Sequence, residues 1–180
     1  MDDIPRRWHH RPNHIFVPGQ IYMITAGTLH KEPLFSGYNR LELLHNTLLE
    51  TFSKHGWEIH AWVVFSNHYH IIAKSPDKRF SVQEPVRELH SVTAREINSI
   101  DGTPGRRVWF QYWDTCITYE QSYYARLRYV MANPVKHGYV QDEFAYPWGC
   151  ARWFEEHLPS SALGRIKSYR CDRVRVVDNF

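Results

Sequence analysis

The residues best suited to carry chemistry in this sequence are two histidines, His68 and His70, in the run HYHIIA. The run predicts a β-strand, and alternate side chains of a strand point to the same face. The two imidazoles would therefore project together, with β-carbons roughly 7 Å apart at a rise of about 3.4 Å per residue. They could bind one metal ion. The sequence also contains 12 histidines, so such a pair arises by chance as well, and the spacing alone leaves a metal site open.

A second pair of residues could act beside such an ion. Tyr129 and Asn133 are four positions apart in a predicted helix and so share one face. Asn133 could supply a carbonyl oxygen to a metal, and Tyr129 could present its phenol next to it. The alternative is structural: an aromatic residue on an amphipathic helix usually belongs to the core, and Asn before Pro is typical of a helix end or a turn.

The elements that must position these four residues follow a recognisable order. Alternating and three-to-four-residue apolar patterns predict strands at 20–29, 57–65, 68–73 and 108–117, and helices at 38–55, 81–100 and 120–132. We expect the last helix to end at Asn133-Pro134. A β-α-β-β-α-β order is typical of a ferredoxin- or RRM-like split β-α-β sandwich. The predicted class is therefore α+β: a four-stranded antiparallel sheet with helices on one face, an added tyrosine-bearing helix and a C-terminal extension.

Composition narrows the class of protein further. The 180 residues suit one compact domain with arms, and the formal charge is +3, with basic residues clustered at both ends. Three cysteines, Cys116, Cys150 and Cys171, form neither a zinc pattern nor a disulfide framework. No stretch approaches the roughly 18 apolar residues of a membrane span, and the N-terminus lacks a secretory signal. We expect a cytoplasmic protein with reduced thiols and no membrane partner.

Two strings link the candidate residues to a known family. Residues 66–70 (SNHYH) resemble the histidine–hydrophobic–histidine ("HUH") motif of single-tyrosine transposases, with Ser66 where the family often has Pro. Residues 129–138 (YVMANPVKHG) are similar to the tyrosine-helix signature of the REP-associated tyrosine transposases. Further similarity at 5–7, 18–25, 109–113 and 146–148 extends the resemblance over most of residues 5–150. We therefore expect a catalytic domain with a basic N-terminal arm at 1–150, and a basic extension at 151–180 that is either a regulatory tail over the DNA site or a plain tail.

The resemblance implies a function for each of the four residues. His68, His70 and Asn133 would hold Mg²⁺ or Mn²⁺, and Tyr129 would be the nucleophile that forms a covalent 5′-phosphotyrosine with DNA. The substrate would be single-stranded or hairpin DNA from palindromic repeats. Lys136 and His137 lie near Tyr129 in sequence, but the residues alone do not select a general base, and both could instead cap the helix. A monomer and a homodimer both remain open.

The free face of the sheet and the basic arms are the expected surfaces for DNA. Single strands bind where aromatic rings meet bases and cationic side chains meet phosphates. The predicted DNA contacts are Arg6, Arg7, Arg11, Arg106, Arg107, Arg126 and Arg128. Two alternatives stay open at this point: a non-catalytic RRM-like module that binds single-stranded nucleic acid, and a metal-dependent hydrolase in which Tyr129 is structural.

Overall fold

A single antiparallel sheet organises the protein. The computed structural model describes residues 17–77 and 81–176. Its strands are β1 (Ile21–Thr28), β2 (Glu58–Val64), β3 (His68–Lys74) and β4 (Trp109–Ile117), in the order β2-β3-β1-β4 with antiparallel neighbours. The order places the first and third strands at the centre, as the split β-α-β arrangement requires. The predicted α+β fold is confirmed.

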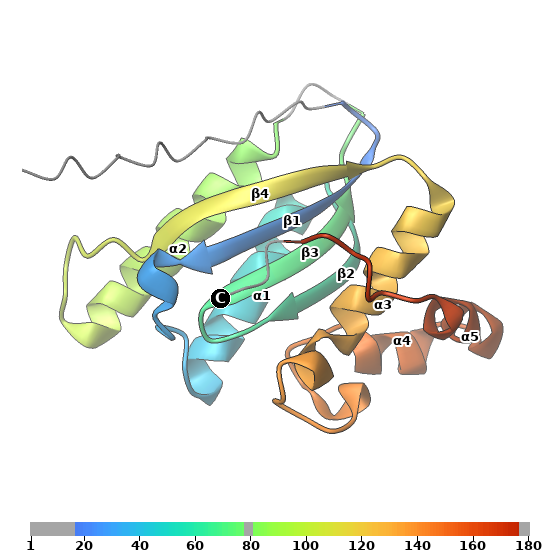
Figure 1. Ribbon diagram of the computed structural model, residues 1–180. Coiled ribbons are helices and arrows are strands. Elements are labelled where there is room, and N and C mark those ends of the chain that lie inside the picture. The colour runs from blue at the N-terminus through green and yellow to red at the C-terminus, as the bar shows by residue number, and fades with distance from the viewer. Residues whose placement is uncertain (1–16, 78–80, 177–180) are drawn as a thin grey trace, which may run out of the picture.

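Two helices cover one face of this sheet. Figure 1 shows α1 (Tyr38–Lys54) and α2 (Gln83–Asp101) together behind the strands. Their buried residues recur at helical spacing, such as Leu44 and Leu48 on α1, which is why the sequence predicts them. On β3 the side chain of Tyr69 points to this side, where its hydroxyl lies 3.1 Å from Nε2 of His90 on α2.

The third long helix, α3 (Glu120–Lys136), lies on the opposite face and contacts β2, β3 and β4. The expected end at Asn133-Pro134 is wrong, because the helix continues through Pro134 to Lys136. Proline inside a helix removes one backbone hydrogen bond and crowds the carbonyl four residues earlier. In α3 this does not end the helix. Gly138, at φ 74°, then ends the helix: its N–H bonds to the carbonyl of Val135, and the N–H of Tyr139 bonds to that of Pro134. This is a Schellman ending, which glycine favours.

The remaining chain folds beside α3 and along the outer strand β2. It forms the short helices η2 (Glu143–Ala145), α4 (Ala151–His157) and α5 (Ser160–Ser168). One further short helix, η1 (Leu29–Lys31), lies between β1 and α1. The N–H of Val64 bonds to the carbonyl of Trp148 at 3.0 Å, and the N–H of Cys150 bonds to that of Trp62 at 2.9 Å. These bonds cover an edge that would otherwise expose unpaired backbone groups. After α5, the chain runs back across the face that α1 and α2 leave uncovered (Figure 1).

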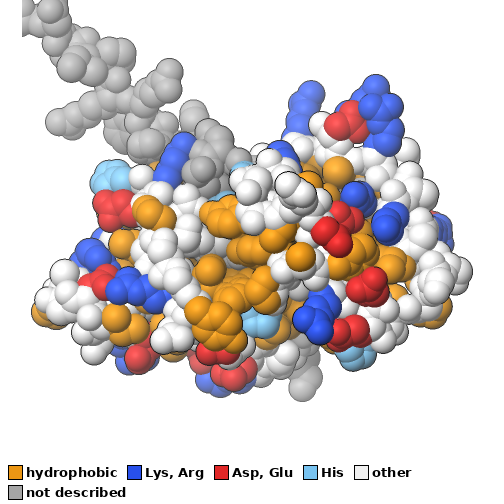
Figure 2. All heavy atoms as spheres, turned by 90° about the horizontal axis from the view of Figure 1, so that it is seen from below, with side chains coloured by type: hydrophobic (Ala, Val, Ile, Leu, Met, Phe, Trp, Pro, Cys, Tyr) orange, Lys and Arg blue, Asp and Glu red, His pale blue; other side chains and the backbone are white. Residues whose placement is uncertain are grey.

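Several large hydrophobic side chains remain exposed near the end of the molecule where α1 begins and α3 ends. They include Tyr38 and Tyr139, which are 64% and 48% exposed. Figure 2, seen from this end, shows hydrophobic side chains gathered near the middle of the surface, with basic and acidic side chains around them.

Across residues 17–77 and 81–176, no helix is both long enough and apolar enough to cross a membrane.

Candidate metal and tyrosine site

His68 and His70 point together to the face of the sheet that carries α3. In the register of β1 and β3, His70 lies opposite Thr25 and His68 lies opposite Gly27. The two imidazole rings have centroids 5.2 Å apart, and the side chains are only 2% and 0% exposed. The strand geometry thus places the two imidazoles side by side in the interior, as the spacing in the sequence predicts.

Each imidazole is oriented through its Nδ1 atom. Nδ1 of His68 lies 2.7 Å from Oδ1 of Asn67, and because a carbonyl oxygen only accepts, this nitrogen carries the hydrogen. Nδ1 of His70 lies 2.7 Å from the hydroxyl of Thr25. The lone pair of His68 is therefore on Nε2, the atom that would bind a metal. Such partners fix the ring and tautomer of metal-binding histidines.

Sequence reasoning missed both of these orienting residues. Asn67 immediately precedes His68 in the motif, but the sequence pattern gives it no contact with the imidazole. Thr25 can be recognised as a partner of His70 only once the register of β1 against β3 is known.

The third predicted ligand, Asn133, lies one helical turn after Tyr129 on α3. Its side chain is fully buried, and within the described residues neither its Oδ1 nor its Nδ2 has a hydrogen-bond partner. Leaving such a group unsatisfied costs about 1–3 kcal/mol, which coordination of Oδ1 to a metal would offset. Two imidazoles and an amide oxygen suit Mn²⁺, and Mg²⁺ accepts oxygen ligands. In the part of the chain that the structure describes, no group of three or more His, Cys, Asp or Glu residues is placed to hold a metal.

Tyr129 lies next to this donor set. Its ring packs edge-on against the imidazole of His70, with centroids 5.6 Å apart, and the residue is 4% exposed. Nζ of Lys136 lies 3.5 Å from the phenolic oxygen and 4.9 Å from the centre of the ring. Lys136 is two helical turns after Tyr129, so it reaches the phenol only because α3 continues through Pro134. The sequence analysis names Lys136 as a neighbour of Tyr129, but a helix that ends at Asn133-Pro134 gives no reason to place its ammonium group on the phenol.

A small cleft leads from the surface to His68. It has a volume of about 320 Å³ and is lined by Asn67, His68, His137, Gly138 and Tyr139. The ring of His137 lies 5.3 Å from that of His68, so the end of α3 forms one wall. A substrate group could approach the buried imidazoles through this opening.

The predicted DNA-contacting arginines fall into three groups. Arg6, Arg7 and Arg11 lie outside the described residues. Three others are engaged within the protein: Arg106 pairs with Asp101 at 2.6 Å, Arg107 donates to the carbonyl of Trp109, and Arg128 pairs with Glu143 at 2.8 Å. Arg126 alone of the four described ones bonds only within its own helix, to Ser122. A DNA-binding role for each of these residues stays a prediction.

The fold agrees with the comparisons with known proteins. Residues 17–140 match the family of IS200-like transposases, and the chain belongs to that family.

Within this group the chain is similar to the REP-associated tyrosine transposases, which confirms the resemblance carried by its motifs. The relative from Escherichia coli K12 is 25% identical over 108 residues, a match that covers 59% of this chain and 62% of the relative. The match thus spans less than two thirds of that relative's length. A solved structure of the REP-associated tyrosine transposase bound to a REP hairpin superposes with a TM-score of 0.65 at 22% identity, covering 96% of this chain and 94% of that one.

Proposed function

We propose that this protein cleaves and rejoins single-stranded DNA through a covalent 5′-phosphotyrosine at Tyr129. The observation that carries the proposal is the packing of the Tyr129 ring against His70, with the buried amide of Asn133 one turn further along the same helix. A nucleophile, two imidazoles and an amide oxygen are thereby gathered where α3 meets β3. This is the donor and nucleophile set that phosphodiester transfer needs.

The reaction conserves the energy of the bond that it breaks. The phenolic oxygen of Tyr129 loses its proton and attacks phosphorus, the P–O3′ bond breaks, and the strand with the 3′-oxygen leaves as a hydroxyl. Attack by another 3′-hydroxyl reverses these changes and releases Tyr129. Strands are therefore exchanged without an external energy source.

His68, His70 and Asn133 would hold Mg²⁺ or Mn²⁺ at this point. Such an ion would supply Lewis-acid stabilisation of the negative charge that develops on the phosphate. The protein side chains supply the positioning: Thr25 and Asn67 orient the imidazoles, and Lys136 lies against the phenol. Burial of the two histidines and the asparagine excludes water from the ligands.

The proposed substrate is a DNA hairpin with a single-stranded flank. The similar solved structure contains a REP hairpin, and the sheet face beside α3 is the surface of this chain on which the flank would lie. Of the predicted contacts, Arg126 is the described arginine whose guanidinium makes no bond outside its own helix.

A denaturing gel tests the proposal. The protein is incubated with Mn²⁺ and an end-labelled single-stranded hairpin, and the wild type is expected to give a slowly migrating covalent adduct. Tyr129→Phe should abolish both adduct and cleavage, whereas the matched control Tyr38→Phe, at an exposed position of α1 that does not line the cleft, should retain them. Cleavage that survives Tyr129→Phe would instead identify a hydrolase. Binding by the wild type without any cleavage would identify a non-catalytic binding module.

A further inference from the structure

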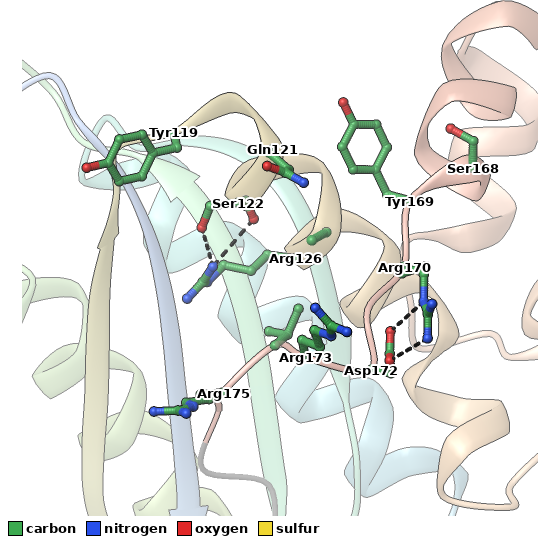
Figure 3. Close-up of a pocket in the computed structure, with 12 residues that line it drawn as sticks. Tyr119, Gln121, Ser122, Arg126, Ser168, Tyr169, Arg170, Asp172, Arg173 and Arg175 are labelled. Atoms are coloured by element: carbon green, nitrogen blue, oxygen red, sulfur yellow. Dashed lines mark hydrogen bonds and ion pairs between the residues drawn. The ribbon is translucent and has the colours of Figure 1, made fainter.

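A larger cleft lies beside the first half of α3, and none of the proposed metal ligands lines it. Its volume is about 950 Å³. One wall is formed by the start of α3, and the other by the chain that follows α5 (Figure 3). Both walls lie on the side of the sheet that α1 and α2 leave uncovered (Figure 1).

The second wall is held in place by its apolar residues. Cys171, Val174 and Val176 pack against the core, and the ring of Tyr169 stacks on that of Tyr124 with centroids 5.0 Å apart. Arg173 and Arg175 stand between these anchors in sequence and are exposed. The apolar side chains thus hold this segment against the core, and the arginines between them extend their guanidinium groups toward the cleft.

The cleft contains more positive than negative charge. Four arginines line it, and its one carboxylate, Asp172, is paired with Arg170 at 2.9 Å. Arg126, Arg173 and Arg175 have no ion-pair partner among residues 17–77 and 81–176. Figure 3 shows Arg126 extending from α3 between the two walls, with the Arg170–Asp172 pair set apart from it.

Arg126 is the member of this set that most requires an anion. It is half-buried, its Nε atom is fully buried without a hydrogen-bond partner in the described residues, and burial lowers its pKa. A partly desolvated guanidinium with unused N–H groups is stabilised by a charge-assisted, two-point contact, and phosphate oxygens match that geometry.

We propose that this cleft binds the phosphodiester backbone of single-stranded DNA that adjoins the nucleotide at Tyr129. The inference rests on the proposed function, because Arg126 precedes Tyr129 by three residues on one helix, about 4.5 Å along its axis. A phosphate on Arg126 therefore belongs to the same strand, close to the cleaved bond. Tyr119, which is 75% exposed, also lines the cleft. It offers its ring to a base, whose faces are free for stacking in an unpaired strand.

Binding measurements on the full chain test this inference without requiring catalysis. Fluorescence anisotropy is recorded at several salt concentrations in the Tyr129→Phe background, with a labelled oligothymidylate of roughly a dozen nucleotides and a duplex of the same length. The test variant is Arg173→Gln with Arg175→Gln. The control, Arg87→Gln with Arg95→Gln, makes the same change of charge at exposed positions of α2, on the other face of the sheet.

The cleft variant should lose about 25-fold in affinity for the single strand at about 0.1 M salt, because each lost phosphate contact lowers the salt slope by about 0.7. The control should change by less than about two-fold, since its arginines contact no DNA. Tyr119→Ala should weaken single-strand binding roughly ten-fold through lost stacking. Equal losses in the cleft and control variants, or an equal loss of duplex binding, would overturn the inference. The assay measures binding and never the covalent adduct. DNA binding by the cleft can therefore be confirmed while the proposed cleavage fails, and cleavage can be confirmed while binding by the cleft fails.

Discussion

The ring of Tyr129 lies edge-on to the imidazole of His70, with a centroid distance of 5.6 Å and an angle of 75° between the planes. One residue comes from α3 and the other from the central strand β3, so the contact joins the helix to the sheet at the proposed site. The orientation of the phenol therefore depends on the orientation of the imidazole. The contacts that position His70 consequently position Tyr129 too.

Replacing Asn133 with Leu should separate stability from metal binding. The amide is buried and without a hydrogen-bond partner in the described residues, so an apolar side chain of similar size should stabilise the metal-free protein by about 1–2 kcal/mol. The same change removes a ligand. Thermal unfolding with EDTA and with Mn²⁺ measures both effects: Mn²⁺ should raise the Tm of the wild type but leave that of the variant unchanged. An Mn²⁺-induced rise of equal size in both proteins would exclude Asn133 as a ligand.

Thr25→Val should weaken metal binding through His70. Valine preserves the shape of threonine but cannot bond to Nδ1 of His70, and loss of such a partner typically reduces metal affinity about 10- to 100-fold. Thr93→Val is the matched control, because the Thr93 hydroxyl is equally buried but bonds to Leu89 and Trp109 on the helix-covered side. Titration with Mn²⁺ should show the loss only for Thr25→Val. Similar affinities in the two variants would contradict the assigned role of Thr25.

Lys136→Met should slow DNA cleavage while metal affinity is retained. The methionine keeps much of the apolar stem but lacks the ammonium group beside the phenol, and a misplaced nucleophile can cost up to about 100-fold in rate. The single-turnover cleavage rate and the Mn²⁺ affinity are to be measured on the same samples. Lys167→Met, on α5, is the control for the lost charge and should cleave at the wild-type rate. A normal rate for Lys136→Met would mean that the lysine only covers the ring.

His90 should make the protein less stable in acid. Burial lowers its pKa to about 3, and its ring stacks on Trp109 at 4.3 Å. Between that pH and the ordinary value near 6.5, the unfolded chain binds a proton that the native protein does not, so stability falls as pH falls through this window and is fully present above it. Urea unfolding from pH 7 to pH 4 should show a shallower decline for His90→Phe than for the wild type. Parallel curves would show that His90 does not contribute to the pH dependence.

The sheet and the long helices could be predicted because their patterns are local. Alternation along β3 shows that His68 and His70 share a face, and the apolar spacing of Leu44 and Leu48 identifies α1. The helices α4 and α5 were missed because they span only 7 and 9 residues, and short helices depend on tertiary packing more than on their own sequence.

The candidate site was predicted only in part for a different reason. His68, His70, Tyr129 and Asn133 are identified by spacing and by motif, whereas Thr25 acts through a cross-strand register that no local pattern encodes. A helix that ends at Asn133-Pro134 leaves Lys136 outside it. In the structure the helix continues for about one further turn, because Gly138 and not Pro134 ends it.

Because α3 continues through Pro134 to Lys136, the residues of the proposed site that lie on it belong to one continuous helix. Arg126, the proposed nucleophile Tyr129, the proposed ligand Asn133 and Lys136 all belong to this helix. A tilt or shift of the helix relative to the sheet would therefore displace all four together. Binding of the DNA strand at Arg126 would thereby be coupled to the alignment of Tyr129 with the phosphodiester bond.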